Sequence, residues 1–356
     1  FLWRKYVLQS FQCFESGIYP FHSQISKSMG IDRLPDPFRT SGKSWCENDS
    51  KTRLSQTLKT TKALNTEKQK WILLIALSVI WGSSFILIKK SLEHFNPFEV
   101  GALRVLISGI VLMPYAISKI RQFPKQHLKW LIVAALSGNF IPMFLFPLAE
   151  TEISSSIAGI INSMMPIFVI IVGSLVWKFS TTRKQLIGVM ISFVGACILA
   201  LGSGESGEIK IYPILLLILA VLLYAISTTT VKSKLQEVPA TIMSAFVFSF
   251  VLFLPSLFAL VFSGFFKHFE MNQDSLTGLG FVAMLSVFGT GLAMMMNYKL
   301  LSISTPLFAS TVTLLMPIVA VIWGILDGET LTTLQSVGAL IILAGLIFLR
   351  SKPKSV

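Results

Sequence analysis

Charged residues are scarce in this chain: they make up 13% of its 356 residues, about half the share in a typical soluble protein. The deficit lies in residues 71–356, which hold only 18 of the 30 Lys and Arg and 11 of the 17 Asp and Glu. Hydrophobic residues make up 53% of the chain and include 28 Phe and 13 Met. This composition excludes a water-soluble enzyme and indicates a polar tail joined to a multi-pass membrane protein.

Disulfide and metal-binding patterns are also missing. The three cysteines form no CxxC pair and no cluster with histidine, and the four histidines lie outside the long apolar runs. The sequence therefore predicts neither a disulfide framework nor a metal site, and we expect no cofactor.

Acidic side chains are nearly absent from the apolar runs. The nearest are Glu99, Glu150 and Glu152, which we expect close to the outer membrane surface. A membrane-embedded enzyme needs a base or paired acids at membrane depth, so the sequence argues against an enzyme. Proton coupling through one of these carboxylates stays open, and exchange or export down a gradient fits the sequence equally well.

Ten uncharged or nearly uncharged runs follow residue 70, and most approach the roughly 20 residues that cross a bilayer as a helix. Their continuous apolar character excludes a membrane β-barrel, whose strands alternate over about 10 residues. We therefore expect an all-α polytopic membrane protein with ten transmembrane helices. The predicted spans are Trp71–Ile88, Pro97–Ile120, Trp130–Ala149, Ile153–Trp177, Gln185–Ser203, Ile211–Val231, Val238–Phe262, Leu276–Tyr298, Leu300–Leu326 and Thr330–Leu349.

Positive charges between the runs predict the orientation. An even number of spans puts both termini on one side of the membrane. With the termini inside, the inner links and the C-terminal end carry 13 Lys and Arg, and the outer links carry Lys89, Lys90, Lys210 and Lys267. The positive-inside bias therefore predicts cytoplasmic termini in the cell (inner) membrane. It also explains the net charge of +13, so we expect lipid and no nucleic acid as the partner.

These patterns divide the chain into four segments. Residues 1–70 are rich in Ser, Thr, Lys and Gln without a period of 2 or 3.6, which predicts a polar, disordered tail. Residues 71–204 and 209–350 form two five-helix halves, and residues 351–356 form a short basic C-terminal tail.

The two halves resemble each other. NSMMPIFVIIVGSLV in the first matches TLLMPIVAVIWGIL in the second when Pro166 is aligned with Pro317, and both prolines are predicted to break their helices. Five spans per half is an odd number, so the copies enter the membrane in opposite directions as an inverted repeat. The match continues at about 150 residues' offset in two glycine pairs, Gly188 with Gly338 and Gly195 with Gly345.

An inverted repeat is typical of secondary transporters, whose halves exchange conformations so that one central site opens to each side in turn. The repeat therefore favours a carrier of a small-molecule substrate that works by alternating access. A non-transporting membrane scaffold or sensor stays the alternative, because a fold alone does not establish transport. The paired glycines indicate close packing, either with a helix of the same chain or with a second copy in a homodimer.

With these features, residues 71–350 resemble the drug/metabolite transporter superfamily, in particular its ten-helix EamA type. The resemblance rests on WGSSF at 81–85, Arg104, the two proline-containing repeats and DGE at 327–329. It implies a secondary transporter in the plasma membrane, often an exporter, for amino acids or related small metabolites.

Arg104 is the charged side chain that we expect deep in a span. An ionised side chain there costs at least about 2.5–3.5 kcal/mol, so it usually pairs or lines a cavity. Its planar donor fork suits a carboxylate or a phosphate. The sequence leaves two interpretations: contact with an anionic substrate, or extension to the outer interface or a neighbouring helix end.

Other polar and aromatic side chains inside the apolar runs also need partners in hydrocarbon. Trp81 shares a helix face with Ser84, and Tyr224 shares one with Thr228, because residues three or four apart lie on one side. Each either lines a cavity or joins helices. The candidate cavity residues are Trp81, Ser84, Arg104, Asn139, Asn162, Tyr224, Thr228, Asn297 and Tyr298.

Overall fold

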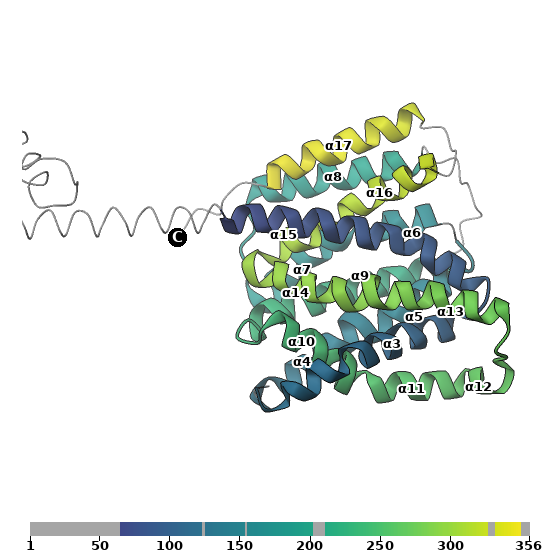
Figure 1. The fold of residues 1–356 in the computed structure, drawn as a ribbon. Coiled ribbons are helices and arrows are strands. Elements are labelled where there is room, and N and C mark those ends of the chain that lie inside the picture. Colours follow the sequence, from purple (N-terminus) through teal and green to yellow (C-terminus); the bar gives the residue numbers. More distant parts are fainter. Residues whose placement is uncertain (1–64, 123–124, 154, 202–210, 327–331, 350–356) are drawn as a thin grey trace, which may run out of the picture. The chain divides into compact units, whose positions relative to one another are not determined.

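The computed structural model describes residues 65–122, 125–153, 155–201, 211–326 and 332–349 (Figure 1). The chain divides into two units, residues 1–69 and 70–356. The predicted C-terminal tail, the DGE motif and residues 1–64 of the predicted N-terminal tail lie outside the described residues. Residues 65–70, which the sequence assigns to the tail, are helical, because Glu, Lys and Gln favour helix beyond the apolar run.

Residues 65–201 form helices connected by short turns. In chain order these are the helix Asn65–Leu92, α3 (Pro97–Ser118), η2 (Ile120–Gln122), η3 (Lys125–His127), α4 (Leu128–Ala135), the π-helix η4 (Leu136–Phe140), α5 (Ile141–Glu150), α6 (Ser155–Asn162), α7 (Met165–Trp177) and α8 (Arg183–Leu201).

Residues 211–349 form a similar series. In chain order these are α9 (Ile211–Lys234), α10 (Ala240–Phe246), the π-helix η5 (Val247–Val251), α11 (Phe253–Phe262), α12 (Phe265–His268), α13 (Gln273–Ser286), the π-helix η6 (Val287–Leu292), α14 (Ala293–Ile303), α15 (Pro306–Ser310), α16 (Val312–Leu326) and α17 (Thr333–Leu349). The described residues contain no strand, which confirms the all-α class.

Within the described part of the chain, seven helices are long and apolar enough to cross a membrane. The number is eight if Ala240–Val251 and Phe253–Phe262, which meet at a 40° bend, count as one span. α8 and α17, which the sequence also predicts as spans, are helices of 19 and 17 residues outside that count. The multi-pass membrane architecture is therefore confirmed, and the number ten stays a prediction.

The predicted boundary between the eighth and ninth spans is wrong. The helix that begins at Gln273 continues through Leu300 to Ile303. The chain turns at Ser304, and Thr305 caps the next helix: its Oγ1 accepts a hydrogen bond from the Phe308 N–H at 3.2 Å. Hydropathy could not place this turn, because Ser, Thr and Pro here lie between equally apolar runs.

α8 and α17 lie side by side (Figure 1) and approach through their glycines. A Cβ atom at Gly338 would lie 2.5 Å from the Leu199 backbone nitrogen, and one at Gly195 would lie 2.7 Å from that of Ile342. These glycines therefore pack helices of the same chain. The repeat relates two such contacts: a Cβ atom at Gly195 would lie 2.9 Å from the Gly338 carbonyl oxygen, and one at its counterpart Gly345 would lie 2.6 Å from that of Gly188, as expected near a pseudo-two-fold axis.

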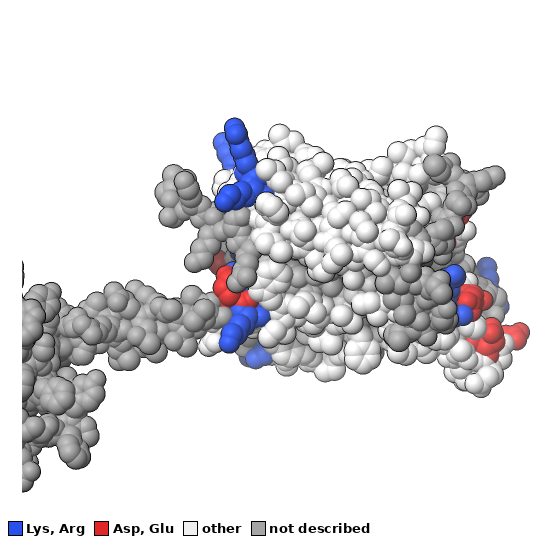
Figure 2. Space-filling model, turned by 90° about the horizontal axis from the view of Figure 1, so that it is seen from above, with Lys and Arg blue, Asp and Glu red and all other residues white. Residues whose placement is uncertain are grey.

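The distribution of charged and apolar side chains on the surface is that of a protein embedded in a membrane. Figure 2 shows charged side chains gathered at two ends with an uncharged surface between them. Large apolar side chains are exposed on it, among them Leu175 at 77% and Ile347 at 72%. Exposed apolar area of this extent is expected where lipid replaces water. The beginning of Asn65–Leu92 and the end of α17 lie at the same end of the helices (Figure 1).

Candidate functional site

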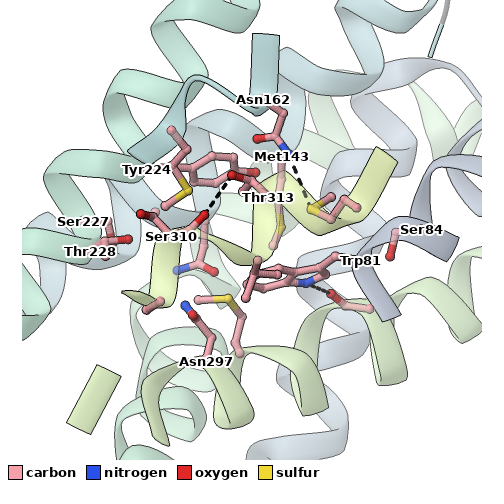
Figure 3. Close-up of a pocket in the computed structure, with 18 of the residues that line it drawn as sticks. Trp81, Ser84, Met143, Asn162, Tyr224, Ser227, Thr228, Asn297, Ser310 and Thr313 are labelled. Atoms are coloured by element: carbon pink, nitrogen blue, oxygen red, sulfur yellow. Dashed lines mark hydrogen bonds between the residues drawn. The ribbon is translucent and has the colours of Figure 1, made fainter. Parts of the chain in front are cut away.

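A cavity lies between the two halves of the chain, and all nine candidate side chains line it. They come from the helix Asn65–Leu92, α3, η4 and α6 of the first half and from α9 and α14 of the second. In Figure 3, Asn162, Tyr224 and Asn297 approach the same space from different helices. The lining also includes Ser310 and Thr313, and apolar side chains that the sequence analysis did not select: Met143, Phe146, Met165, Met294 and Met316.

Arg104 lies inside the protein at this cavity and does not reach the outer interface. Only 8% of the residue is exposed, and its Nε donates a hydrogen bond to Thr290 Oγ1 of η6 at 3.4 Å. The structure gives its terminal N–H groups no hydrogen bond to a described residue. A buried guanidinium with unused donors beside a cavity is suited to hold a carboxylate in a bidentate pair.

Two π-helices border the cavity at equivalent positions of the repeats. η4 carries Asn139, and η6 carries Gly289, 150 residues later. Trp81 Nε1 donates a hydrogen bond to the Gly289 carbonyl oxygen at 2.9 Å (Figure 3). A π-helical turn is wider than an α-helical one and frequently occurs at functional sites. Here the turns bring one amide and one backbone carbonyl to the cavity wall.

Asn139 and Asn162 use only part of their hydrogen-bonding capacity. Asn139 Nδ2 donates to Tyr298 Oη at 3.3 Å, and Asn162 Nδ2 donates to Met316 Sδ at 3.6 Å. Both Oδ1 atoms are buried without a hydrogen-bond partner among the described residues. A buried acceptor without a donor costs free energy, so a donor from a bound ligand would stabilise the site.

The remaining candidate side chains differ in whether their polar atoms already have a hydrogen-bond partner. Ser84 Oγ donates to the Ile80 carbonyl of its own helix at 2.9 Å, which is the structural role that hydroxyls often have in membrane helices. The Tyr224 ring packs on Phe146 with centroids 5.8 Å apart. The side chains of Tyr224, Thr228 and Asn297 make no hydrogen bond to a described residue, which leaves their polar atoms for a ligand.

The two prolines occupy different positions in their spans. Pro166 lies in the first turn of α7, directly after the interruption at Ser163 and Met164 that separates α6 from α7. Pro317 lies inside α16, and the interruptions in that span come earlier, at Ser304 and Thr311.

Glu150, which the sequence analysis places close to the outer membrane surface, ends a candidate span, and neighbouring helices enclose its carboxylate oxygens. It is the last residue of α5, and both carboxylate oxygens are buried without a hydrogen-bond partner among the described residues. Glu152, two residues later, is exposed. The hydropathy profile treats the two alike, because it does not record which helices pack against α5.

A multi-pass helical protein with a partly polar cavity between repeated halves has the architecture of a membrane transporter. The EamA-like transporter family matches residues 69–201 and 211–351. The chain therefore belongs to this family, which confirms the resemblance found in the sequence and indicates a transporter rather than an enzyme.

Named relatives agree with this assignment. The chain is 27% identical over 281 residues to an uncharacterized transporter of Archaeoglobus fulgidus, covering 78% of this chain and 97% of that protein. It is 28% identical over 286 residues to a probable amino-acid metabolite efflux pump of Salmonella typhimurium, covering 77% and 92%. The inner membrane transporter YedA of Escherichia coli, itself uncharacterized, is 25% identical over 267 residues, covering 74% and 84%.

The fold also matches a protein of known crystal structure. The TM-score is 0.63 at 14% identity, and the match covers 80% of this chain and 96% of that one. At this identity the match supports the fold alone.

Proposed function

We propose that this protein is a secondary transporter that exports a small α-amino acid or a closely related metabolite across the plasma (inner) membrane by alternating access. The observation that carries the proposal is the buried guanidinium of Arg104, with unused donors, in a cavity that also holds two amides with unused acceptors. A scaffold needs no such cavity.

The chemistry of the lining matches both ends of an amino acid. Arg104 would bind the carboxylate through its donor fork. Asn139 and Asn162 would accept hydrogen bonds from the ammonium group through their carbonyl oxygens. The methionine and phenylalanine side chains of the lining would surround an apolar substituent, because unbranched thioethers adapt to irregular shapes.

The arrangement of the halves supports alternating access. We assign ten spans as two inverted five-helix repeats, residues 71–204 and 209–350, with both termini in the cytoplasm. Equivalent positions meet across the centre: Ser192 Oγ donates to the Ile342 carbonyl oxygen at 3.1 Å, and Ser163 Oγ donates to that of Thr313 at 3.4 Å. A site between exchanging halves opens to one side at a time. We propose export as the direction of transport because one relative is named a probable amino-acid metabolite efflux pump.

Exchange of radiolabelled amino acids tests the proposal. The purified full chain is reconstituted in liposomes loaded with unlabelled L-leucine, L-methionine or L-phenylalanine, and entry of the same labelled compound is measured without any ion gradient. We expect exchange of at least one probe. In Arg104→Gln, exchange at low substrate should fall by about tenfold or more, because a hydrogen bond to a charged group contributes about 1.5–3 kcal/mol.

Arg121→Gln is the matched control, because Arg121 is exposed outside the predicted spans. It should exchange as the wild type does. Absence of exchange for all three probes with folded protein would contradict the proposal, and equal exchange by Arg104→Gln would remove Arg104 from the site.

A further inference from the structure

Two tryptophans and two lysines form a cluster where one end of α4, α7 and α9 meet. Trp130 lies in the first turn of α4 and Trp177 ends α7, and their rings meet edge to face with centroids 5.8 Å apart. Lys234, the last residue of α9, has its Nζ over both rings, 5.5 Å from each centroid. Lys129 Nζ lies 5.5 Å from the Trp130 centroid. The four residues meet because α9 packs against both α4 and α7.

The positive charge of this cluster is not neutralised by protein groups in the described part of the chain. Lys129 and Lys234 are exposed and make no ion pair with a described residue, and the exposed Lys178 after the end of α7 adds a third cation. Glu237, the acid closest to Lys234 along the chain, has its Oε2 3.3 Å from His127 Nε2 instead. Neighbouring cations repel one another, so a bound anion would stabilise this arrangement.

The surroundings of the cluster favour a lipid headgroup as that anion. Tryptophan is enriched where the hydrocarbon of a bilayer meets the headgroups, because its ring is apolar and its N–H is polar. Within one turn of the two tryptophans, the apolar side chains of Leu175 and Val176 on α7 and Ile132 on α4 are exposed. A free phosphate would use the lysines alone, whereas a phospholipid would use the lysines and this apolar surface together.

We propose that this cluster, Lys129, Trp130, Trp177 and Lys234, binds the headgroup of an anionic phospholipid. The ammonium groups hold the phosphate, and the acyl chains lie along α4 and α7. Basic pockets between transmembrane helices on the cytoplasmic side are typical sites for such headgroups. The basic links predict that this end of the helices is the cytoplasmic one.

The lipid site is separate from the substrate cavity, because none of its four residues lines that cavity. α4 and α7 belong to the first half of the chain and α9 to the second. A lipid bound here therefore joins the two halves at one end. The proposal goes beyond the transport function and does not depend on which substrate the cavity takes.

Thermal unfolding with defined lipids tests the proposal. The full chain is purified in detergent, delipidated, and titrated with phosphatidylglycerol, with phosphatidylcholine of the same acyl chains, or with inorganic phosphate. A ligand of the folded state stabilises it by mass action, so the melting temperature should rise with phosphatidylglycerol and not with the other two. Equal stabilisation by phosphatidylcholine would overturn the role of the lysines. Equal stabilisation by inorganic phosphate would overturn the assignment to a lipid.

Lys234→Gln removes the ammonium group that both rings share. One lysine near an anionic lipid surface contributes about fivefold in affinity, so half-maximal stabilisation should need about fivefold more phosphatidylglycerol. Lys234→Arg keeps the charge and the ring contact and should bind as the wild type does. Lys184→Gln is the matched control: it makes the same charge change at an exposed lysine in the first turn of α8, outside the cluster. Unchanged affinity in a folded Lys234→Gln protein, or an equal loss in Lys184→Gln, would contradict the site.

Native mass spectrometry counts the lipids that stay bound. The double variant Lys129→Gln/Lys234→Gln should retain one phosphatidylglycerol fewer than the wild type, and Lys184→Gln should retain as many as the wild type. Equal numbers on the wild type and the double variant would overturn the proposal. Neither experiment measures transport, so failure of the lipid site is distinguishable from failure of the transport function.

Discussion

Asn139 and Tyr298 are the most deeply buried of the nine candidate side chains, with exposed fractions of 0% and 1%. They come from opposite halves of the chain, and their 3.3 Å hydrogen bond joins η4 to α14 across the cavity. It also holds the Asn139 amide in one orientation. The Tyr298 hydroxyl therefore orients the Asn139 amide, which we propose binds the ammonium group of the substrate.

Tyr298→Phe tests this role at the residue scale. The variant removes the acceptor of the Asn139 N–H, and a buried donor left unpaired costs about 1–3 kcal/mol. We expect a lower melting temperature in detergent and weaker stabilisation by the transported amino acid. Tyr212→Phe makes the same change at an exposed tyrosine, and its melting temperature should equal that of the wild type. Identical melting of the two variants would show that the hydrogen bond contributes nothing.

At the scale of elements, the contact between α8 and α17 depends on the absence of side chains. Gly195 and Gly338 each face the backbone of the opposite helix, at positions where a Cβ atom has no space. Lipid tails are as apolar as leucine, so helices in a membrane associate through close van der Waals contact and interhelical hydrogen bonds rather than through the hydrophobic effect. The repeated glycines provide that contact within a single chain.

Gly338→Ala should force the two helices apart. The added Cβ meets the Leu199 backbone, which cannot move without its helix, and overpacking of this kind costs about 1–3 kcal/mol. We expect a lower melting temperature in detergent. Gly280→Ala is the matched control: no atom lies within 4 Å of a Cβ atom built there, and alanine favours helix over glycine. A Gly338→Ala protein that melts at or above the control would contradict the packing argument.

At the scale of the whole molecule, the transport proposal depends on the number and direction of the spans. The beginning of Asn65–Leu92 and the end of α17 lie at one end of the helices, as an even number of spans requires (Figure 1). The basic links predict that this end faces the cytoplasm. The η3 turn would then be cytoplasmic, and the start of α13 would face outward.

Cysteine labelling tests this topology. In a background without native cysteines, Gln126→Cys lies in η3 and Gln273→Cys begins α13, and both side chains are exposed. We expect a membrane-impermeant thiol reagent to label Gln273→Cys in intact cells and Gln126→Cys only after permeabilisation. The reverse pattern would invert the orientation. Labelling of both in intact cells would mean that an even number of spans separates the two positions, in place of the five predicted spans.

Much of the fold is predictable because hydropathy and periodicity are properties of short segments. The helical class, the multi-pass character, the repeat and the family all follow from the order of the residues. The nine candidates meet at one cavity because polar groups in hydrocarbon need partners, which is a general cost that requires no coordinates. Their contact with a substrate stays a prediction.

The local sequence does not decide which neighbours a residue meets. The turn at Ser304 lies between equally apolar runs, Pro317 stays inside its helix, and Glu150 and Glu152 differ in burial although only one residue separates them. The order of the residues therefore determined that this chain is a helical membrane protein with two related halves and an arginine inside a predicted span. Only the tertiary structure decided that the carboxylate oxygens of Glu150 are buried, because the burial of an atom is set by helices distant in the sequence.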